Sequence, residues 1–156
     1  MKKILIIVSE FNSEVTSSLL EGAKSVLEKA QCAFEVEFVP GAYELAQLAA
    51  VGVKTQRYAG VIALGCVIRG ETPHFDYVCQ QAAAGLMQVS IENQLPVSFG
   101  VLTTDTVAQA RARSGLSKDQ KQQDGKQLVE NKGEDAAQVV LSMMKSMARL
   151  QEGVQL

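Results

Sequence analysis

The sequence predicts an α/β fold in which a parallel sheet carries helices on both faces. Apolar runs of strand length alternate with apolar residues at helical spacing through the whole chain of 156 residues. The run YAGVIALGCVI, residues 58–68, is almost uninterrupted, which is typical of a parallel strand buried on both faces. With 47% hydrophobic residues, a chain of this length can bury one ordinary core, so we expect a single domain over residues 1–156.

The first part of the chain predicts a strand, a helix and a second strand. KKILIIV at 2–8 is a β-branched apolar run, which favours a strand. A helix is expected next, because apolar residues recur at helical spacing at Val15, Leu19, Leu20, Ala23, Val26, Leu27 and Ala30. AFEVEFVPG at 33–41 alternates apolar and acidic residues, which predicts an edge strand that Pro40 and Gly41 end. Its inward side chains would be Phe34, Val36 and Phe38, opposite the outward Glu35 and Glu37.

The rest of the chain continues this alternation. Helices are expected at 42–56, 76–94, about 105–114 and 132–151, and strands at 58–68 and 96–104. Such alternation implies right-handed βαβ units and a parallel sheet whose central strand is 58–68. Because the half-polar second strand belongs at an edge, we expect four strands in the order 2-1-3-4, a flavodoxin-like three-layer sandwich.

Composition and charge exclude several kinds of partner. Fifteen basic and seventeen acidic residues leave a net charge of -2 without a basic stripe, so we expect no nucleic acid partner. The apolar stretch in MKKILIIVSEFN is far shorter than a signal core or a membrane span, which predicts a cytoplasmic protein with no membrane partner. Cys32, Cys66 and Cys79 lack the close spacing of zinc or redox sites and are expected to be reduced thiols with packing roles.

The informative loops follow the four expected strands. They read SEFNS, PGAYE, RGETPH and TTDT in strand order. Open parallel sheets bind their ligands beyond the carboxyl ends of the strands, where the connections leave in opposite directions. We therefore expect the functional site at this edge of the sheet.

The loop RGETPH, residues 69–74, suits an oxyanion. Free backbone N–H groups, the flexible Gly70 and the hydroxyl of Thr72 stand at the start of a helix whose dipole favours negative charge. The same residues also make ordinary turns, so a plain turn is an equal alternative. His74, the one histidine of the sequence, is then either a structural residue or a general acid or base beside the anion.

Three further residues have a local interpretation, and two of them, Glu44 and Phe11, have a functional one as well. Glu44 suits the first turn of a helix, or it accepts hydrogen bonds from ligand hydroxyls. Phe11, before the cap-like Asn12 and Ser13, is either a hydrophobic staple or a stacking platform for a flat ligand. Arg113 complements the carbonyl end of a helix and needs no further role. The sequence contains no metal-ligand cluster, Walker loop or G-x-G-x-x-G motif, so the residues alone indicate a parallel α/β protein with a phosphate-bearing small ligand.

Taken together, the loops resemble those of the lumazine synthase family. The resemblance rests on FN at 11–12, PGAYE at 40–44, GCVIRGETPHFDYV at 65–78, PVSFGVLTTDT at 96–106, Arg113 in ARSG, and NKG at 131–133. It implies a transferase of riboflavin biosynthesis that condenses 5-amino-6-ribitylamino-2,4-pyrimidinedione with 3,4-dihydroxy-2-butanone 4-phosphate to give 6,7-dimethyl-8-ribityllumazine, phosphate and water. No metal or organic cofactor is implied, because imine formation, phosphate loss and ring closure need orientation and proton transfer.

The resemblance also implies the residues of the site. His74 would be the catalytic residue that moves protons, and the phosphate would be held by Gly70, Glu71, Thr72 and Arg113. Phe11 would stack on the pyrimidine, and the other substrate-binding residues would be Ala42, Tyr43, Glu44, Cys66, Val67, Ile68, Phe99 and Lys132. Members of this family take Phe99, Arg113 and Lys132 from the neighbouring subunit, so we expect active sites at the interfaces of a homo-pentamer. A functional link to riboflavin synthase is implied as well.

The chain departs from the family pattern in three places. Glu10 stands where an arginine often precedes FN. The sequence begins almost at the first strand, so we do not expect the added strand by which a preceding segment extends the neighbouring sheet in many members. The connection SGLSKDQKQQDGKQLVE at 114–130 is longer than usual, polar, and expected to project or to extend a helix. Its bulk should obstruct a shell of about sixty subunits, so we expect a free pentamer, with a decamer of two rings as the alternative.

Overall fold

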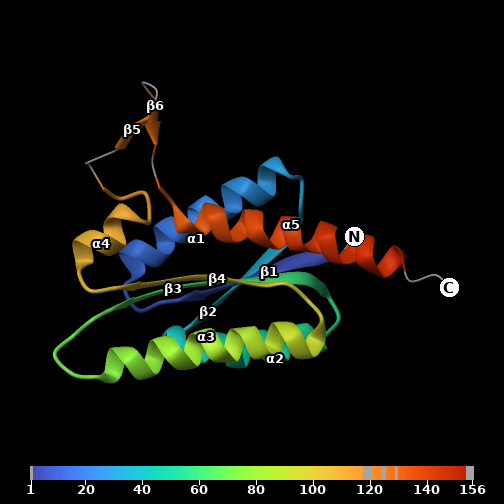
Figure 1. Cartoon of the computed structure of the whole chain (residues 1–156), viewed down its shortest axis with the longest axis horizontal. Helices are drawn as coiled ribbons and strands as arrows, with labels where there is room; N and C mark the ends of the chain where they lie inside the picture. Colours follow the sequence, from blue (N-terminus) through green and yellow to red (C-terminus); the bar gives the residue numbers. More distant parts are fainter. Residues whose placement is uncertain (1, 118–120, 124–125, 129, 154–156) are drawn as a thin grey trace.

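A four-stranded parallel sheet forms the centre of the molecule (Figure 1). The computed structural model describes residues 2–117, 121–123, 126–128 and 130–153. The sheet has the order β2-β1-β3-β4, and each neighbouring pair of strands is parallel. The strands are β1 Lys3–Ser9, β2 Phe34–Val39, β3 Tyr58–Ile68 and β4 Val97–Thr104. The predicted flavodoxin-like order is confirmed, with the half-polar β2 at an edge.

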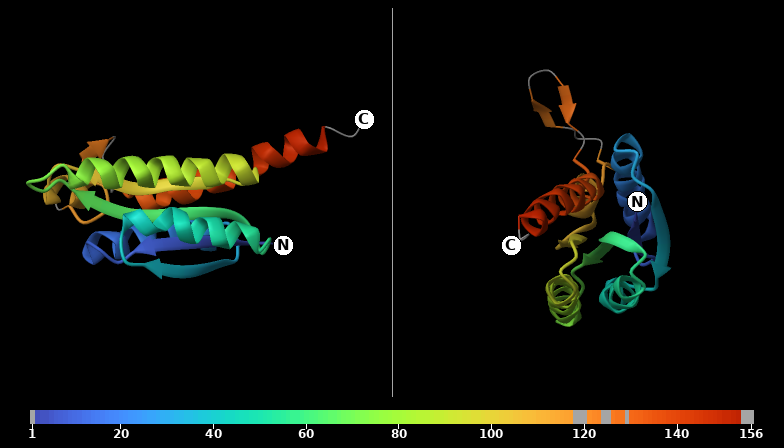
Figure 2. Two further views of the ribbon diagram at one scale, coloured as in Figure 1. Left: turned by 90° about the horizontal axis from the view of Figure 1, so that it is seen from below. Right: turned by 90° about the vertical axis from the view of Figure 1, so that its right-hand side faces the viewer.

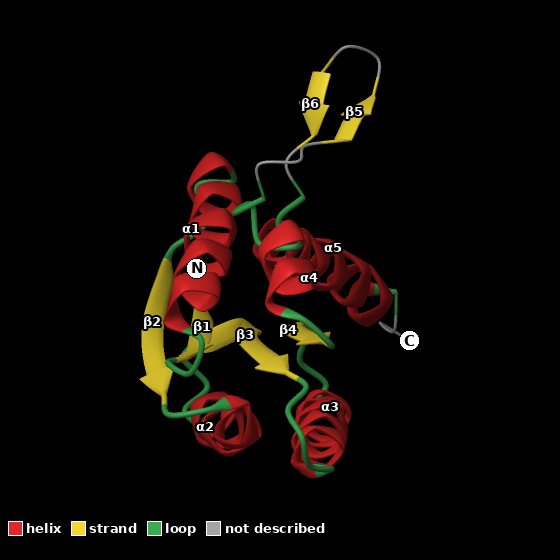
Figure 3. Cartoon of the chain, turned by 90° about the vertical axis from the view of Figure 1, so that its left-hand side faces the viewer, coloured by secondary structure: helices red, strands yellow, loops and turns green. Residues whose placement is uncertain are grey.

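Helices cover both faces of the sheet and complete three layers. Figure 3 shows α1, α4 and α5 on one side of the strands and α2 and α3 on the other, and Figure 2 shows the same layers in two further views. The helices are α1 Ser13–Lys29, α2 Leu45–Lys54, α3 His74–Asn93, α4 Val107–Ala112 and α5 Lys132–Glu152, and a short 3-10 turn, η1 Ala42–Glu44, leads into α2. All the helices expected from apolar spacing are present, although α3 begins earlier than the predicted residue 76.

The core consists of two apolar layers separated by the sheet. Side chains of β1 point alternately to its two faces, so Ile6 packs with α1 and α5, whereas Ile7 packs with α2 and α3. β3 lies between β1 and β4, and its residues 60–66 are buried. This burial on both faces explains the uninterrupted apolar run. Because the strands are parallel, the segments that follow them all begin at the carboxyl edge of the sheet.

The prediction for one side chain of β2 is wrong. Phe34 and Val36 pack against the layer that contains α1 and α5, as expected, but Phe38 is 55% exposed. β2 is the outermost strand, and the next residue, Val39, is buried in the layer of α2 and α3 on the opposite face. Alternation predicts the face on which a side chain lies, but it does not predict whether a neighbour covers that position.

The long connection 114–130 contains a small hairpin. Its described strands, β5 Lys121–Gln123 and β6 Lys126–Leu128, pair antiparallel and project from the body beyond α4 (Figure 3). The expected projection is confirmed, and the alternative of an extended helix is wrong for these strands. The sequence carried a signal, because an Asp-Gly pair such as that at 124–125 is typical of a hairpin. Residues 118–120, 124–125 and 129 of the connection lie outside the described part of the chain.

Glu35 ties the edge strand β2 to its neighbours. Its carboxylate accepts hydrogen bonds from Nζ of Lys3 at 2.7 Å, from Nη2 of Arg57 at 2.8 and 2.7 Å, and from the hydroxyl of Tyr58 at 2.5 Å. The hydrogen bond from Lys3, helped by that from Tyr58 and by the charge of Arg57, lowers the pKa of Glu35 to about 2. The glutamate predicted to face solvent is therefore an anchor between β2 and the amino-terminal ends of β1 and β3.

We expect Glu35→Gln to destabilise the protein in a pH-dependent way. A carboxyl group whose pKa is lower in the folded chain contributes stability that is present above its ordinary pKa near 4.5 and is lost as the pH falls toward 2. The loss of unfolding free energy caused by the substitution should therefore be large at about pH 7 and small at about pH 2. Urea unfolding of both proteins at the two pH values measures this. An equal loss at both would show that packing, rather than charge, matters at this position.

Candidate active site

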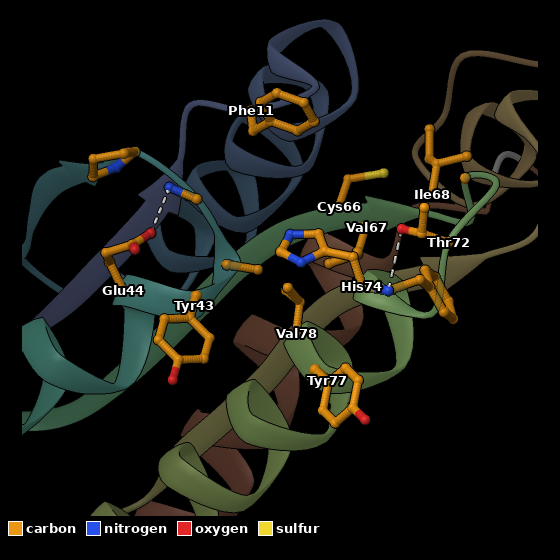
Figure 4. Close-up of a pocket in the computed structure, with 15 residues that line it drawn as sticks. Phe11, Tyr43, Glu44, Cys66, Val67, Ile68, Thr72, His74, Tyr77 and Val78 are labelled. Carbon is orange, nitrogen blue, oxygen red and sulfur yellow. Dashed lines mark hydrogen bonds between the residues drawn. The ribbon is translucent and has the colours of Figure 1, made fainter.

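The loops that follow β1, β2 and β3 meet around one cavity (Figure 4). Its volume is about 590 Å³. Ten of the predicted site residues line it, namely Phe11, Ala42, Tyr43, Glu44, Cys66, Val67, Ile68, Gly70, Thr72 and His74. Glu71 is exposed on the same loop as Gly70 but does not line the cavity. The carboxyl edge of the sheet thus brings the predicted residues together from the end of β3 and from the segments that follow three strands.

Glu44 has the local role that its place at a helix start predicts. Its Oε2 accepts a hydrogen bond from the backbone N–H of Gly41 at 3.0 Å, which fixes the first turn of η1. Within the described chain, no group donates to its Oε1. The same carboxylate that orders the turn can therefore accept a hydrogen bond from a ligand hydroxyl in the cavity.

Phe11 is not a hydrophobic staple. Its side chain is 72% exposed, whereas a staple packs against the first turn of the helix. The N–H groups of Glu10 and Phe11 donate to the carbonyl oxygens of Val39 and Pro40 at 2.8 and 3.1 Å, and these bonds hold the loop beside β2. An exposed aromatic ring that lines a cavity is suited to stacking on a flat ligand.

Asn12 ties the loop after β1 to β3. Its backbone is left-handed, with φ 60°, and its side chain makes no capping bond to α1, so its predicted role as a side-chain cap is wrong. Instead, Nδ2 donates a hydrogen bond to the carbonyl oxygen of Cys66 at 2.8 Å. Asparagine adopts this backbone conformation more readily than most residues, which explains the residue type. The bond places Phe11 close to the end of β3.

Arg69 anchors the loop 69–74 to two other elements. Its Nε donates to Oδ1 of Asp105 at 2.9 Å, and its Nη1 donates to Oδ1 of Asp76 at 3.2 Å. The guanidinium carbon lies 4.2 Å from the centre of the Phe75 ring. The hydrogen bond with Asp105, helped by that with Asp76, raises the pKa of Arg69. Two carboxylates thus neutralise this cation, which leaves it a structural role beside the loop.

The loop itself is open at the start of α3. A Cβ atom added to Gly70 would meet no atom within 4 Å, so the backbone can be approached closely. The backbone N–H of His74 donates to Oγ1 of Thr72 at a long 3.5 Å (Figure 4). The first N–H groups of a helix have no partner within the helix, and α3 is 20 residues long. This arrangement favours an anion at the loop more than a closed turn would.

Cys66 contributes its backbone and its volume to the cavity rather than a nucleophile. The residue is 2% exposed, and burial raises the pKa of its thiol to about 11. The thiol is therefore protonated at neutral pH and unreactive. Cys32, Cys66 and Cys79 are all free, as predicted.

The described lining of the cavity offers no lysine or arginine to a phosphate. Among the described residues that line it, the ionisable side chains are Glu44, His74, Cys66 and two tyrosines, and none is a lysine or an arginine. The nearest arginine along the chain, Arg69, is paired with aspartates. A dianionic ligand would meet backbone N–H groups here without a balancing positive charge.

Phe99, Arg113 and Lys132 line a second cavity instead. This groove of about 470 Å³ runs along β4 and α5 and includes Ser98, Asp135 and Val139 among its other lining residues. β4 is an edge strand, so the groove borders the open side of the sheet. The predicted site residues therefore fall into two separate sets within one chain.

The two cations of the groove come from the two ends of the long connection. Nη1 of Arg113 donates to the carbonyl oxygen of Gln109 at 3.1 Å, which confirms its place at the carbonyl end of α4. Nζ of Lys132 pairs with Asp135 at 2.9 Å and with Glu130 at 3.1 Å. Its hydrogen bond with Asp135, helped by that with Glu130, raises the pKa of Lys132. Despite the long connection, both side chains line one groove.

Comparison with known families decides the identity of the chain. Residues 1–148 match the model of a family described as 6,7-dimethyl-8-ribityllumazine synthase. The chain belongs to this family. Lumazine synthases are transferases of riboflavin biosynthesis, and the chain has this function, as its loops predict.

Two relatives are similar to this lumazine synthase family member over most of their length. The 6,7-dimethyl-8-ribityllumazine synthase 1 of Caulobacter vibrioides is 44% identical over 153 residues, which cover 96% of this chain and 93% of the relative. The 6,7-dimethyl-8-ribityllumazine synthase of Protochlamydia amoebophila is 42% identical over 145 residues, which cover 91% of this chain and 78% of the relative.

In the part of the chain that the structure describes, no helix is both long and apolar enough to cross a membrane. No group of three or more His, Cys, Asp or Glu side chains in the same part of the chain is arranged to hold a metal ion.

Sequence reasoning missed several residues of the lumazine synthase cavity. Phe75, Tyr77 and Val78 line it from the first turn of α3, and Pro40 and Gly41 line it from the loop after β2. A signal was available, since Tyr77 and Val78 follow His74 by one helical turn and so share its face. The tie between Asn12 and Cys66 had no such signal, because it joins residues far apart in the sequence.

Proposed function

We propose that this chain condenses 5-amino-6-ribitylamino-2,4-pyrimidinedione with 3,4-dihydroxy-2-butanone 4-phosphate in a site completed by a second copy of itself. The cavity of one subunit would hold both substrates, and the groove of the next subunit would contribute Phe99, Arg113 and Lys132. The products are 6,7-dimethyl-8-ribityllumazine, phosphate and water. The names of both relatives support this reaction.

The distribution of charge carries the proposal. A phosphate monoester bears close to two negative charges, and no described residue that lines the cavity is a lysine or an arginine. The groove of the same chain presents Arg113 and Lys132 but has no anion loop of its own. Bringing the groove of one subunit over the cavity of another would supply the missing cations, since charge-assisted hydrogen bonds to phosphate are among the strongest.

Exposed apolar side chains support an assembly. On α3 they form a helical stripe of Tyr77, Ala84, Met87 and Ile91, and on α5 they are Val139, Met143 and Leu150. Monomeric proteins rarely leave such stripes in water. A contact that joins two different surfaces is head-to-tail, and it closes into a ring when the rotation between neighbouring subunits divides a full turn evenly. We propose a ring of five, in which each subunit both gives and receives a groove.

The cavity residues would have distinct roles in binding. Phe11 would stack on the pyrimidine ring, and the backbone at 66–68 would hydrogen-bond its edge. The ribityl chain would lie along residues 42–44, with Oε1 of Glu44 accepting from its hydroxyls. The phosphate would bind the open loop 70–72 at the start of α3, opposite Arg113 of the neighbour.

His74 would transfer protons during the condensation. Imine formation removes protons from the attacking amine and delivers them to the departing water, and loss of phosphate needs a proton removed from the carbon chain. His74 stands at the start of α3 beside the loop that would hold the phosphate, so its imidazole could reach the carbon chain of that substrate (Figure 4). The two subunits would also accelerate the reaction by holding the two substrates in the right orientation, without a metal or an organic cofactor.

The experiment that tests the function is turnover. Purified protein is incubated with the two substrates, and the fluorescence of the lumazine product is followed. Product formation in proportion to protein concentration supports the proposal. Absence of product at high protein concentration would favour a binding module of the same fold that holds a flavin or a lumazine without catalysis.

We expect the protein in solution to be a free ring of five chains. The hairpin of β5 and β6 projects from the region between α4 and α5, where its bulk should obstruct further contacts between rings (Figure 1). Light scattering coupled to size exclusion should give a mass near five chains. A mass near ten chains would indicate two stacked rings, and a particle of about sixty chains would contradict the proposed obstruction.

The proposal includes where the enzyme acts and which enzyme uses its product. The whole chain would act as one domain in the cytoplasm. Its product would pass to riboflavin synthase, so a functional link between the two enzymes is expected.

A further inference from the structure

We propose that Asn131 is a positioning residue, which holds Arg113 and Lys132 in register as one unit for the neighbouring active site. The inference rests on the proposed function, in which both cations serve the substrates of the next subunit. The long connection 114–130 separates the two cations along the chain. Something other than sequence proximity must therefore set the distance between their side chains.

The backbone brings the two ends of this connection together. The N–H of Lys132 donates to the carbonyl oxygen of Arg113 at 2.9 Å, and Ser114 and Asn131 form an antiparallel bridge. The chain thus leaves the body at Ser114 and returns beside it at Asn131. Arg113 and Lys132 line the same groove, so this pairing fixes the distance between the backbone positions that carry the two charged side chains.

The amide of Asn131 holds the pairing against the rest of the fold. Its Oδ1 accepts a hydrogen bond from the N–H of Gly133 at 2.9 Å, which caps α5. Its Nδ2 donates to the carbonyl oxygens of Ser18 at 3.0 Å and of Ser114 at 3.3 Å. The carbonyl oxygens of Ser18 and Ser114 require a donor, and the N–H of Gly133 requires an acceptor. An amide in this orientation offers both to all three backbone groups. One side chain joins α1, the end of α4 and the start of α5.

The amide occupies a closely fitted slot. A Cβ atom added to Gly22 of α1 would lie 2.6 to 2.7 Å from the side-chain atoms of Asn131. The hydroxyl of Ser18 donates to the same carbonyl oxygen of Ser114 at 2.5 Å, and Ser114 is fully buried. Lys132, by contrast, is only half-buried and keeps its ammonium group among surface carboxylates. The packed amide therefore fixes the backbone while the charges stay at the surface, where a partner subunit would meet them.

The variant Asn131→Asp separates capping from positioning. Aspartate is as good a helix cap as asparagine, so α5 should keep its start. A carboxylate cannot donate to the carbonyl oxygens of Ser18 and Ser114 and is repelled by them. We expect the KM for 3,4-dihydroxy-2-butanone 4-phosphate to rise by about tenfold or more, with kcat changed only a few-fold. The backbone amide of Lys132 should also exchange faster with deuterium.

A matched control adds the same charge elsewhere on α5. Gln138 is exposed and does not line the groove, so Gln138→Glu should keep the KM and the Lys132 exchange rate of the unmodified protein. An unchanged KM and unchanged exchange in Asn131→Asp would overturn the proposal. A loss of activity that only follows a lower unfolding temperature or a lost ring would overturn it too, because Asn131 would then be a helix cap alone. If the unmodified protein shows no turnover, the proposed reaction fails instead, and exchange at Lys132 still decides whether Asn131 fixes the register.

Discussion

Replacing Arg113 with alanine is expected to raise the KM for 3,4-dihydroxy-2-butanone 4-phosphate by about 10²-fold, because a charge-assisted hydrogen bond that the neighbouring subunit encloses commonly contributes a few kcal/mol. The described part of the cavity presents no lysine or arginine that could replace it. The KM for the pyrimidine should change much less. Steady-state rates at saturating pyrimidine measure the effect, and inhibition by inorganic phosphate gives a second reading of the same anion site.

Replacing His74 with alanine should instead lower kcat. One general acid or base typically contributes about 10²–10⁴-fold to a rate, and the condensation has some spontaneous chemistry that limits the loss. Binding of the phosphate substrate should be weakened less than in Arg113→Ala. Equal losses of binding and rate in both variants would contradict these separate roles.

Mixing the two variants tests whether the site is shared between subunits. In a ring assembled from both variants, about a quarter of the sites would combine an intact His74 from one chain with an intact Arg113 from the next. Coexpression with two different affinity tags yields such rings, and their activity should exceed that of either variant alone. No recovery in rings shown to contain both chains would place both residues in the site of a single subunit.

The fold was predictable because burial and local pattern agree in most elements. The apolar run of β3 lies between two strands and under helices on both faces, so its composition and its place correspond. The half-polar β2 is at the edge for the same reason. Phe38 and the paired strands in 114–130 escaped prediction, since one depends on which neighbours cover a single face of the edge strand and the other on pairing within a polar segment.

The part of the site that lies at the carboxyl ends of the strands could be predicted from the sequence. The end of β3 and the segments that follow β1, β2 and β3 supply the ten cavity residues, and their positions follow from the alternation of strands and helices. The separation of Phe99, Arg113 and Lys132 from the cavity could not follow from spacing, because spacing along the chain does not say which cavity a side chain lines. The motif NKG shows the same limit. Its lysine is the visible charge, while the contacts of Asn131 and Gly133 with α1 appear only in three dimensions.

Gly133→Ala is expected to destabilise the protein by about 4 kcal/mol or more, among the largest effects of a single substitution. A Cβ atom at this position would lie 1.9 Å from the carbonyl oxygen of Leu19 and 2.6 Å from its carbonyl carbon. These are backbone atoms of α1, so no side chain can move aside, and the two helices would have to separate. Separation would also break the bond between Asn131 and Ser18.

The sign of the effect distinguishes close packing from helix propensity. Alanine is favoured over glycine in a helix by about 1 kcal/mol, so without the contact Gly133→Ala would stabilise α5. Gly153 at the other end of α5 is the matched control, because a Cβ atom there would meet only Arg149 and Leu150 carbonyl oxygens at 3.6 and 3.7 Å. Gly153→Ala should leave the urea midpoint nearly unchanged, whereas Gly133→Ala should lower it strongly or prevent recovery of folded protein. A Gly133→Ala protein as stable as the unmodified chain would mean that α1 and α5 do not approach this closely. The proposed role of Asn131, which bonds α1 at Ser18, would then be contradicted as well.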